Sequence, residues 1–227
     1  METTLHQQLK RHYAASTSDV EVRVGAFRID AVRDDELIEI QCASLSAIRA
    51  KATELLRRHR LRIVKPIIVR TRILKSKTKE GKITSRRMSP KRGDVLDIFE
   101  ELIYFTRVFP HENLTIELPL VTVAQHRLPA AGRRRRRWQK DYRIADVTLE
   151  SIDDGSELTS PADLLGLLSV GDRAVVTRQT ETFDTADLAK RLGKPRWVTQ
   201  KIAYVLRHCG AIEAHGRTRT GIRYRAA

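Results

Sequence analysis

The segments Arg28-Ile29-Asp30-Ala31-Val32 and Leu37-Ile38-Glu39-Ile40-Gln41 decide the expected fold of this chain. Each segment alternates apolar with polar residues, which is typical of a strand that buries one face. A turn over Asp34-Asp35 would join them as an antiparallel hairpin. In that register Asp30 lies opposite Glu39, on the face that also carries Gln41, because alternate residues of a strand point the same way.

The neighbouring segments predict a mixed α/β domain around this hairpin. Short alternating runs indicate strands, and apolar residues at helical spacing indicate helices. The expected order is a helix over 2–14, strands over 20–24, 27–32 and 37–42, a helix over 45–59 and a strand over 61–64 continuing to residue 68. A basic hairpin turning at 79–82, a helix from Ser89-Pro90 to Phe105 and a strand over 114–123 complete the domain.

The paired carboxylates carry the sharpest chemical signal. Directly opposed side chains in a hairpin have Cβ atoms about 4.5 to 5.5 Å apart, and like charges at that distance are unfavourable. A Mg²⁺ or Mn²⁺ ion bound to Asp30 and Glu39 would offset this repulsion, since such ions take oxygen ligands. The ion would support phosphodiester hydrolysis by activating water and stabilising the leaving oxygen. The alternative is a solvated face on which Arg28 neutralises the pair.

Asp30, then Glu39 nine residues on, then Gln41, resembles the Asp…Glu-x-Lys signature of the PD-(D/E)xK nucleases. The resemblance covers residues 1–125 or so and implies a restriction-endonuclease-like core. It implies that Asp30 and Glu39 are metal ligands and that Gln41 occupies the catalytic lysine position, where it departs from the pattern. Lys65, at the end of the following strand, is a further catalytic candidate, with a solvated strand-end charge as the alternative.

A second module is expected near the C-terminus. Thr185 to Leu192 predicts a short helix that ends at Gly193, and Pro195 suits the first turn of the next helix. The apolar stripe of that helix is expected to comprise Trp197, Val198, Ile202, Val205 and Leu206. A basic hairpin pairing 211–215 with 222–225 follows. Residues 160–227 thereby resemble a winged helix-turn-helix.

In such modules the second helix enters the major groove of DNA. Outward positions are expected at Arg196, Thr199, Gln200 and Ala203. Arg196 and Gln200 suit base edges, whereas phosphates suit the remaining candidates, which are Thr199, Lys201, Arg217, Arg219, Arg223 and Arg225. The alternatives are a protein-contact surface or a solvated basic face.

The overall charge favours a polyanionic partner. The chain carries 43 Lys and Arg against 28 Asp and Glu, a formal net charge of +15. Nucleic acid, DNA more than RNA, is preferred over a membrane surface or an acidic protein. A run of five arginines, Arg133, Arg134, Arg135, Arg136 and Arg137, adds a stretch that can bind phosphate without reading sequence. A basic linker or a localisation signal is the alternative for this run.

Three consecutive segments are expected: a nuclease-like α/β domain over 1–128, a basic linker and strand segment over 129–159, and a winged helix-turn-helix over 160–227. No apolar run reaches the length of about 20 residues that spans a bilayer, so a cytoplasmic protein is expected. Two cysteines indicate neither a disulfide framework nor a zinc site. A homodimer is an open possibility, and the whole chain is similar to an uncharacterised bacterial family.

The resulting expectation is a Mg-dependent endonuclease that hydrolyses DNA. The alternative is a catalytically inactive DNA-binding protein or transcriptional regulator with a nuclease fold. The two differ in whether Asp30 and Glu39 act as a metal pair.

Overall fold

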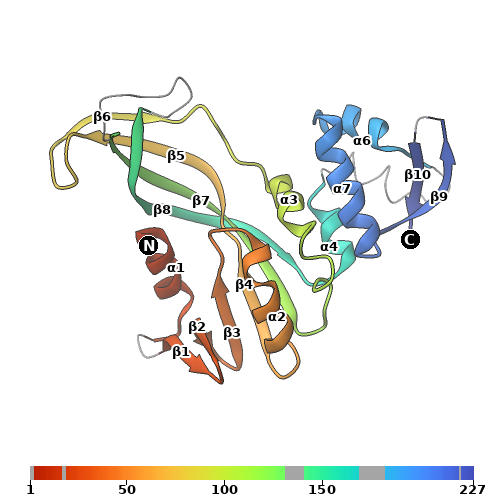
Figure 1. Cartoon of the computed structure of the whole chain (residues 1–227), viewed down its shortest axis with the longest axis horizontal. Helices are drawn as coiled ribbons and strands as arrows, with labels where there is room; N and C mark the ends of the chain where they lie inside the picture. Colours follow the sequence, from red (N-terminus) through yellow and green to blue (C-terminus); the bar gives the residue numbers. More distant parts are fainter. Residues whose placement is uncertain (1–2, 17–18, 131–140, 169–181, 220) are drawn as a thin grey trace. The chain divides into compact units, whose positions relative to one another are not determined.

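A computed structural model of the chain describes residues 3–16, 19–130, 141–168, 182–219 and 221–227 (Figure 1). Its described part is mixed α/β, with an eight-stranded mixed sheet and a separate two-stranded hairpin. The sheet has the order β1-β2-β3-β4-β7-β5-β6, and β8 pairs with β7. The mixed α/β class predicted from the sequence is confirmed.

The elements follow one another in an order close to the prediction. They are α1 (Thr4–Tyr13), β1 (Val20–Val24), β2 (Phe27–Arg33), β3 (Glu36–Ile40), η2 (Leu45–Ile48), α2 (Arg49–Leu55), β4 (Arg60–Val64), β5 (Ile67–Ser76), β6 (Ile83–Met88), η3 (Val95–Asp97), α3 (Ile98–Leu102), β7 (Leu114–Pro129), β8 (Tyr142–Leu158), α4 (Pro161–Gly166), α6 (Thr185–Leu192), α7 (Arg196–His208), β9 (Ile212–Thr218) and β10 (Gly221–Ala226).

The hairpin of β2 and β3 has the predicted register. Ala31 pairs with Ile38 and Arg33 with Glu36, in antiparallel orientation. The turn contains Asp34, whose φ of 46° lies in the left-handed region that aspartate tolerates better than most residues. Because a shift of one residue would move every side chain to the other face of the sheet, this register fixes which residues can reach the site.

Helix α1 packs against this hairpin. The hydroxyl of Thr3 caps the helix by accepting a hydrogen bond from the backbone N–H of His6. Leu5, Leu9 and Tyr13 are buried on one side of the helix. They form a core with Ala31, Ile38, Ile40, Val64, Val121 and Val123. Burial of this apolar stripe therefore places the neighbouring polar residues of α1 next to β2 and β3.

Strand β7 is longer than the sequence predicted, and β8 lies within the segment 129–159 that was expected to hold a linker and a strand. The expected strand over 114–123 continues to Pro129, and β8 begins at Tyr142 and ends at Leu158. Gly155 allows the close approach of the two strands, because a Cβ at this position would overlap the carbonyl oxygen of Leu118. The length of these strands depends on tertiary pairing, so it cannot be predicted from the local sequence pattern.

The helix expected from Ser89-Pro90 begins later than predicted. A turn of 3₁₀ helix starts at Val95, and α3 starts at Ile98. The chain before it is held extended against β5, because the backbone N–H of Gly93 donates to the carbonyl of Ile68. A Cβ at Gly93 would overlap that carbonyl oxygen. The backbone contact therefore takes precedence over the helix-start signal of Ser89-Pro90.

The chain divides into two compact units that alternate along the sequence. One comprises residues 1–42, 64–94 and 118–155, and the other comprises 43–63, 95–117 and 156–227. The second unit contains α6, α7 and the β9–β10 hairpin in the order that the sequence predicted. The predicted boundaries at 128 and 160 stay a prediction.

Helix α6 ends at Gly193, as predicted, and Asp184 caps its start. Asp184 accepts hydrogen bonds from the backbone N–H groups of Ala186 and Asp187, and Gly193 ends the helix with a φ of 60°. In the described residues no helix has the length and apolar character needed to cross a membrane.

Candidate functional site

The Asp30 carboxylate lies at the point where the paired part of β2 and β3 ends. Beyond the pair of Ala31 and Ile38, its Oδ2 atom accepts a hydrogen bond of 2.9 Å from the backbone N–H of Ile40. The same oxygen lies 3.2 Å from Nε2 of His6, which is also 2.9 Å from the carbonyl oxygen of Ile40. The Asp30 side chain thus accepts the hydrogen bond from the Ile40 N–H, and the backbone of β3 fixes the position of the Asp30 carboxylate.

Lys10 supplies the charge that compensates the carboxylates. Its side chain is 7% exposed, and its Nζ atom lies 2.9 Å from Oε1 of Glu21 and 3.3 Å from Oδ1 of Asp30. The register of β1 and β2 pairs Val20 with Ala31, which brings Glu21 level with Asp30. Lys10 therefore bridges carboxylates on two adjacent strands, at a depth where an unpaired charge would be costly.

Glu21 has a backbone conformation that is uncommon for its residue type. Its φ is 59°, in the left-handed region, although it lies within β1. Its carboxylate pairs with Lys10 and with Arg28, and these contacts lower the pKa of Glu21, with the hydrogen bond from Lys10 as the largest cause. A strained backbone at a charged residue is the kind of outlier that occurs at functional sites.

Opposing effects set the ionisation of Asp30. Burial acts to raise its pKa, but hydrogen bonds from His6 and the Ile40 N–H, with the charges of His6 and Lys10, outweigh burial. The net result is a pKa below the usual value of 3.8. Asp30 is therefore an anion at neutral pH, as a metal ligand must be.

Of the other predicted catalytic residues, Glu39 lies in β3, Gln41 directly follows β3 and Lys65 directly follows β4. The register that pairs Ala31 with Ile38 carries Glu39 to the level of Asp30. Glu39 is 6% exposed, Gln41 9% and Lys65 8%, so three polar side chains are buried here. The backbone N–H of Gln41 donates to the carbonyl of Val64 at 2.8 Å, which places Gln41 beside the end of β4, where Lys65 follows.

Lys65 and Asp30 also act on a common neighbour. Desolvation raises the pKa of the Cys42 thiol to about 11, the Lys65 charge lowers it and the Asp30 charge raises it. Both charges are therefore close enough to influence one sulfur atom. We call His6, Lys10, Glu21, Asp30, Glu39, Gln41 and Lys65 the Asp30 cluster.

The Asp30 cluster suits a hard cation in its oxygen donors and in the ionised state of Asp30. Lys10 competes with such an ion, because its ammonium group lies 3.3 Å from Oδ1 of Asp30. Among the described residues no three or more His, Cys, Asp or Glu side chains are arranged to hold a metal. An ion would therefore depend on two carboxylates, with water and phosphate oxygens as its other ligands.

Arg28 was the alternative source of compensating charge, and its guanidinium group pairs with Glu21. The contacts from α1 to Asp30 were not part of the prediction. His6 and Lys10 are four residues apart on α1, on the same side of the helix. This spacing, next to the apolar positions Leu5 and Leu9, is the signal that could have identified Lys10.

The outward face of α7 differs from the prediction by about one position. Thr199 and Ala203, expected outside, are fully buried, whereas Trp197, expected inside, is 54% exposed. The hydroxyl of Thr199 donates to the carbonyl oxygens of Thr185 and Arg196, which satisfies this polar group inside the unit. Trp197 instead lies under the ammonium group of Lys201, 4.6 Å from the ring centroid.

The predicted nucleic-acid contacts fall into two groups. Arg196, Gln200, Arg217 and Arg219 are exposed, and Lys201 is partly exposed. Arg223 is held by Asp187 at 2.9 Å and by Thr182, and Arg225 is held by Glu213. The second group therefore already has partners within the protein, and its contacts with phosphate stay a prediction. The run from Arg133 to Arg137 lies outside the described residues.

Comparisons with known proteins identify relatives without a described activity. The domain of unknown function DUF8091 matches residues 3–159, which is most of the chain. An uncharacterised protein from Treponema pallidum (strain Nichols) is 26% identical over 190 residues, covering 83% of this chain and 72% of the relative. No solved structure matches. The expected similarity to an uncharacterised family is confirmed, and membership of a nuclease family stays a prediction.

Proposed function

The chain belongs to the family defined by the domain of unknown function DUF8091, and we propose that it is a metal-dependent nuclease that hydrolyses DNA at the Asp30 cluster. One observation carries the proposal. The Asp30 carboxylate is held ionised where the pairing of β2 with β3 ends, at the level of Glu39, and Glu39, Gln41 and Lys65 are buried in or directly after β3 and β4 of the same sheet. Buried charge costs free energy, so a cluster of this kind is a candidate site for chemistry.

The order of elements supports the same proposal. Helix α1, strands β1 to β3, helix α2 and strand β4 follow one another, and β4 lies next to β3 in the sheet. This order is similar to that of the PD-(D/E)xK nucleases, in which the Asp and Glu come from adjacent strands. The likeness is one of element order, so the chemistry is argued from the side chains.

Asp30 and Glu39 are the residues that would hold Mg²⁺ or Mn²⁺. When bound, the ion polarises the scissile phosphate and lowers the pKa of the attacking water. Lys10 keeps the Asp30 carboxylate in place through its contact with Oδ1. Because Lys10 also contacts Glu21 at 2.9 Å, it can turn from Asp30 to Glu21 and free one oxygen for a ligand.

The remaining members of the Asp30 cluster position the substrate. Gln41 has an amide oxygen that can accept a hydrogen bond from water, although it lacks the charge of lysine. Lys65 and Lys10 supply that charge, and an ammonium group beside the phosphate stabilises the negative charge that develops during hydrolysis. His6 holds Asp30 by its Nε2 contact at 3.2 Å.

DNA recognition is assigned to the second unit, in which α6, α7 and the β9–β10 hairpin act as a winged helix-turn-helix. Exposed Arg196 and Gln200 on α7 would contact base edges, whereas Arg217 and Arg219 of the hairpin would contact phosphates. Lys201 is 3.4 Å from Glu100, so a phosphate would compete with that carboxylate.

A second candidate is a DNA-binding protein without nuclease activity. The contact of Lys10 with Asp30 favours it, because this ion pair already offsets the charge for which a metal was expected. In this case Asp30, Lys10 and Glu21 stabilise the packing of α1 on the hairpin. DNA affinity would then be unaffected by loss of Asp30.

Cleavage of labelled single-stranded, duplex and branched DNA with Mg²⁺ or Mn²⁺ tests the proposal. Asp30→Asn and Glu39→Gln should each abolish metal-dependent cutting while DNA binding is kept. Asp35→Asn is the matched control, because it removes the same charge from the exposed turn of the same hairpin. A folded wild type that binds DNA but cuts none of these substrates with either metal would favour the second candidate.

A further inference from the structure

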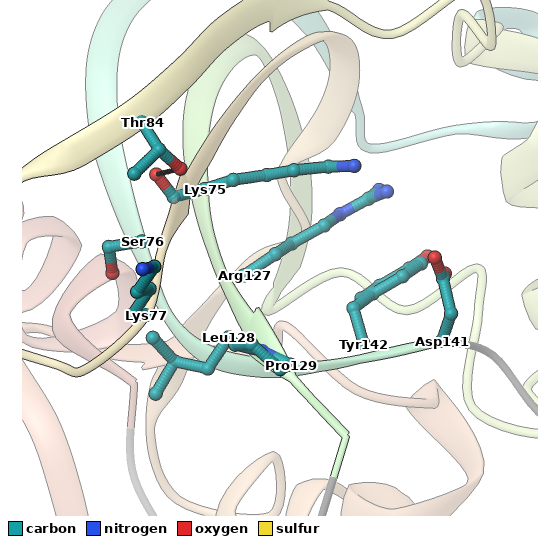
Figure 2. A pocket seen from close by; sticks show the side chains of 9 residues that line it. All are labelled: Lys75, Ser76, Lys77, Thr84, Arg127, Leu128, Pro129, Asp141 and Tyr142. Atoms are coloured by element: carbon teal, nitrogen blue, oxygen red, sulfur yellow. Dashed lines mark hydrogen bonds between the residues drawn. The ribbon is translucent and has the colours of Figure 1, made fainter.

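A cavity of about 330 Å³ lies in the first unit, at the ends of β5 and β7 and the start of β8 (Figure 2). Lys75, Lys77, Arg127, Asp141 and Tyr142 line it together with Ser76, Thr84, Leu128 and Pro129. These residues do not include any member of the Asp30 cluster. The volume is at the lower end of the range of about 300 to 1,000 Å³ that is usual for small-molecule sites.

The parallel register of β5 and β7 brings two cations together. Lys75 pairs with Arg127, and paired residues of adjacent strands point to the same face. Figure 2 shows the two side chains extending side by side, with their charged ends directed to the side where Tyr142 lies. Like charges on adjacent positions of a sheet are destabilising, so this pair has a cost that an anionic ligand would remove.

The described residues offset this charge only in part. The Arg127 guanidinium lies 3.9 Å from the centroid of the Tyr142 ring, and its Nε donates to Gln125 at 2.6 Å. Within the described segments neither Lys75 nor Lys77 forms an ion pair, and Asp141 contributes the single carboxylate of the lining. Positive charge therefore exceeds negative charge around the cavity.

The backbone around the two lysines is fixed before any ligand arrives. Ser76 is 3% exposed, and its hydroxyl is 2.8 Å from Nε2 of His126 and 2.5 Å from the carbonyl of Thr78. Thr84 donates to the carbonyl of Lys75 from β6. The Arg127 side chain is restrained by its contact with the Tyr142 ring. A site with fixed cations loses less entropy when it binds an anion.

We propose that this cavity binds the phosphate of a nucleotide. The Arg127 guanidinium offers paired N–H donors that match phosphate oxygens, and the ammonium groups of Lys75 and Lys77 add point charges. The Tyr142 ring supplies an aromatic surface for the sugar or base. The nucleotide is either free or the end of a nucleic-acid strand, since both present the same phosphate. The proposal is independent of cleavage at the Asp30 cluster.

Calorimetric titration of the full chain tests the proposal. The probes are inorganic phosphate, a mononucleotide, and a short single-stranded oligonucleotide with or without a 5′-phosphate. The double substitution Lys75→Gln and Arg127→Gln removes both paired cations and keeps much of each side chain. Its control is Lys82→Gln with Arg86→Gln, which removes two exposed cations from the β5–β6 hairpin outside the cavity lining.

One of two results is expected for the wild type and for the control variant. Either both bind the mononucleotide, or both bind the 5′-phosphorylated strand more tightly than the unphosphorylated strand. The Lys75 and Arg127 double variant should bind at least about tenfold more weakly, since each charge-assisted hydrogen bond lost is worth that much. Binding of the free mononucleotide identifies a nucleotide site, and preference for the phosphorylated strand alone identifies a strand-end site. Absence of binding for every probe, or equal weakening in the control variant, would overturn the proposal. Circular dichroism confirms folding of both variants.

Discussion

Replacement of Asp30 should destabilise the chain through two separable contacts. In Asp30→Asn the side chain can still accept the hydrogen bond from the Ile40 N–H, but the charge facing Lys10 is lost. Hydrogen bonds to charged groups contribute about 1.5 to 3 kcal/mol, so we expect a loss of about 2 kcal/mol in the free energy of unfolding. Lys10 keeps its contact with Glu21, which limits the loss.

Asp30→Ala should cost more than Asp30→Asn. It also leaves the N–H of Ile40 without its acceptor, and Ile40 is only 4% exposed. A buried donor without a partner costs about 1 to 3 kcal/mol in addition. The two variants therefore separate the contribution of the charge from that of the backbone hydrogen bond.

The pH dependence should follow from the depressed pKa of Asp30, whose usual value is 3.8. A group with a lowered folded-state pKa contributes its full stability above the unfolded-state pKa. This contribution is lost as the pH falls through the folded-state pKa. The difference in stability between wild type and Asp30→Asn should thus shrink as the pH falls below about 4.

Urea denaturation followed by circular dichroism measures these differences, with Asp35→Asn as the control. Hydrogen exchange adds a local measurement, because the Ile40 amide should exchange faster in Asp30→Ala than in the wild type. A loss of stability in Asp30→Ala no larger than that in Asp35→Asn, or an unchanged exchange rate of the Ile40 amide, would contradict these contacts of Asp30.

Three further substitutions test other parts of the structure. Gly155→Ala should lower the free energy of unfolding by about 1 to 3 kcal/mol, because the added Cβ has no space between β7 and β8. Gly216 has open space around it, so Gly216→Ala should be near neutral in the same thermal denaturation assay. Thr199→Val should cost about 1 kcal/mol in a urea titration, since the buried hydroxyl donates to two carbonyls; unchanged stability would contradict the burial of this side chain. Arg217→Gln should weaken DNA binding and reduce its salt dependence by about one phosphate contact, with no change in the melting temperature of the protein. Arg223→Gln should lower the melting temperature, because it breaks the ion pair with Asp187. The opposite pattern would contradict the assignment of Arg217 to DNA contact.

Local pattern was enough to predict the β2–β3 hairpin. Alternation of apolar and polar residues sets the face of each strand, and Asp34-Asp35 is a turn sequence, so the register followed from the residues. The end of α6 at Gly193 was predictable for the same reason, because a left-handed C-cap favours glycine. In both cases a short-range preference agrees with the tertiary structure.

The contacts of the Asp30 carboxylate could not be predicted in the same way. They depend on where α1 packs, which is decided by the burial of Leu5, Leu9 and Tyr13 against strands distant in the sequence. The helical stripe of α7 was placed about one position away because Thr199 is polar and Trp197 apolar. Thr199 is buried because its hydroxyl forms hydrogen bonds inside the unit, whereas Trp197 is exposed and contacts a lysine. Residue polarity is a weaker guide where specific partners exist.

Binding of Mn²⁺ in the absence of DNA tests most directly whether the Asp30 cluster is a metal site. Electron paramagnetic resonance of free Mn²⁺ gives the bound fraction for the wild type, Asp30→Asn, Lys10→Met and the Asp35→Asn control. We predict that the wild type and Asp35→Asn bind Mn²⁺, that Asp30→Asn does not, and that Lys10→Met binds it more tightly because the competing ammonium group is gone. Equal binding by wild type and Asp30→Asn, or no binding even by Lys10→Met, would contradict the account.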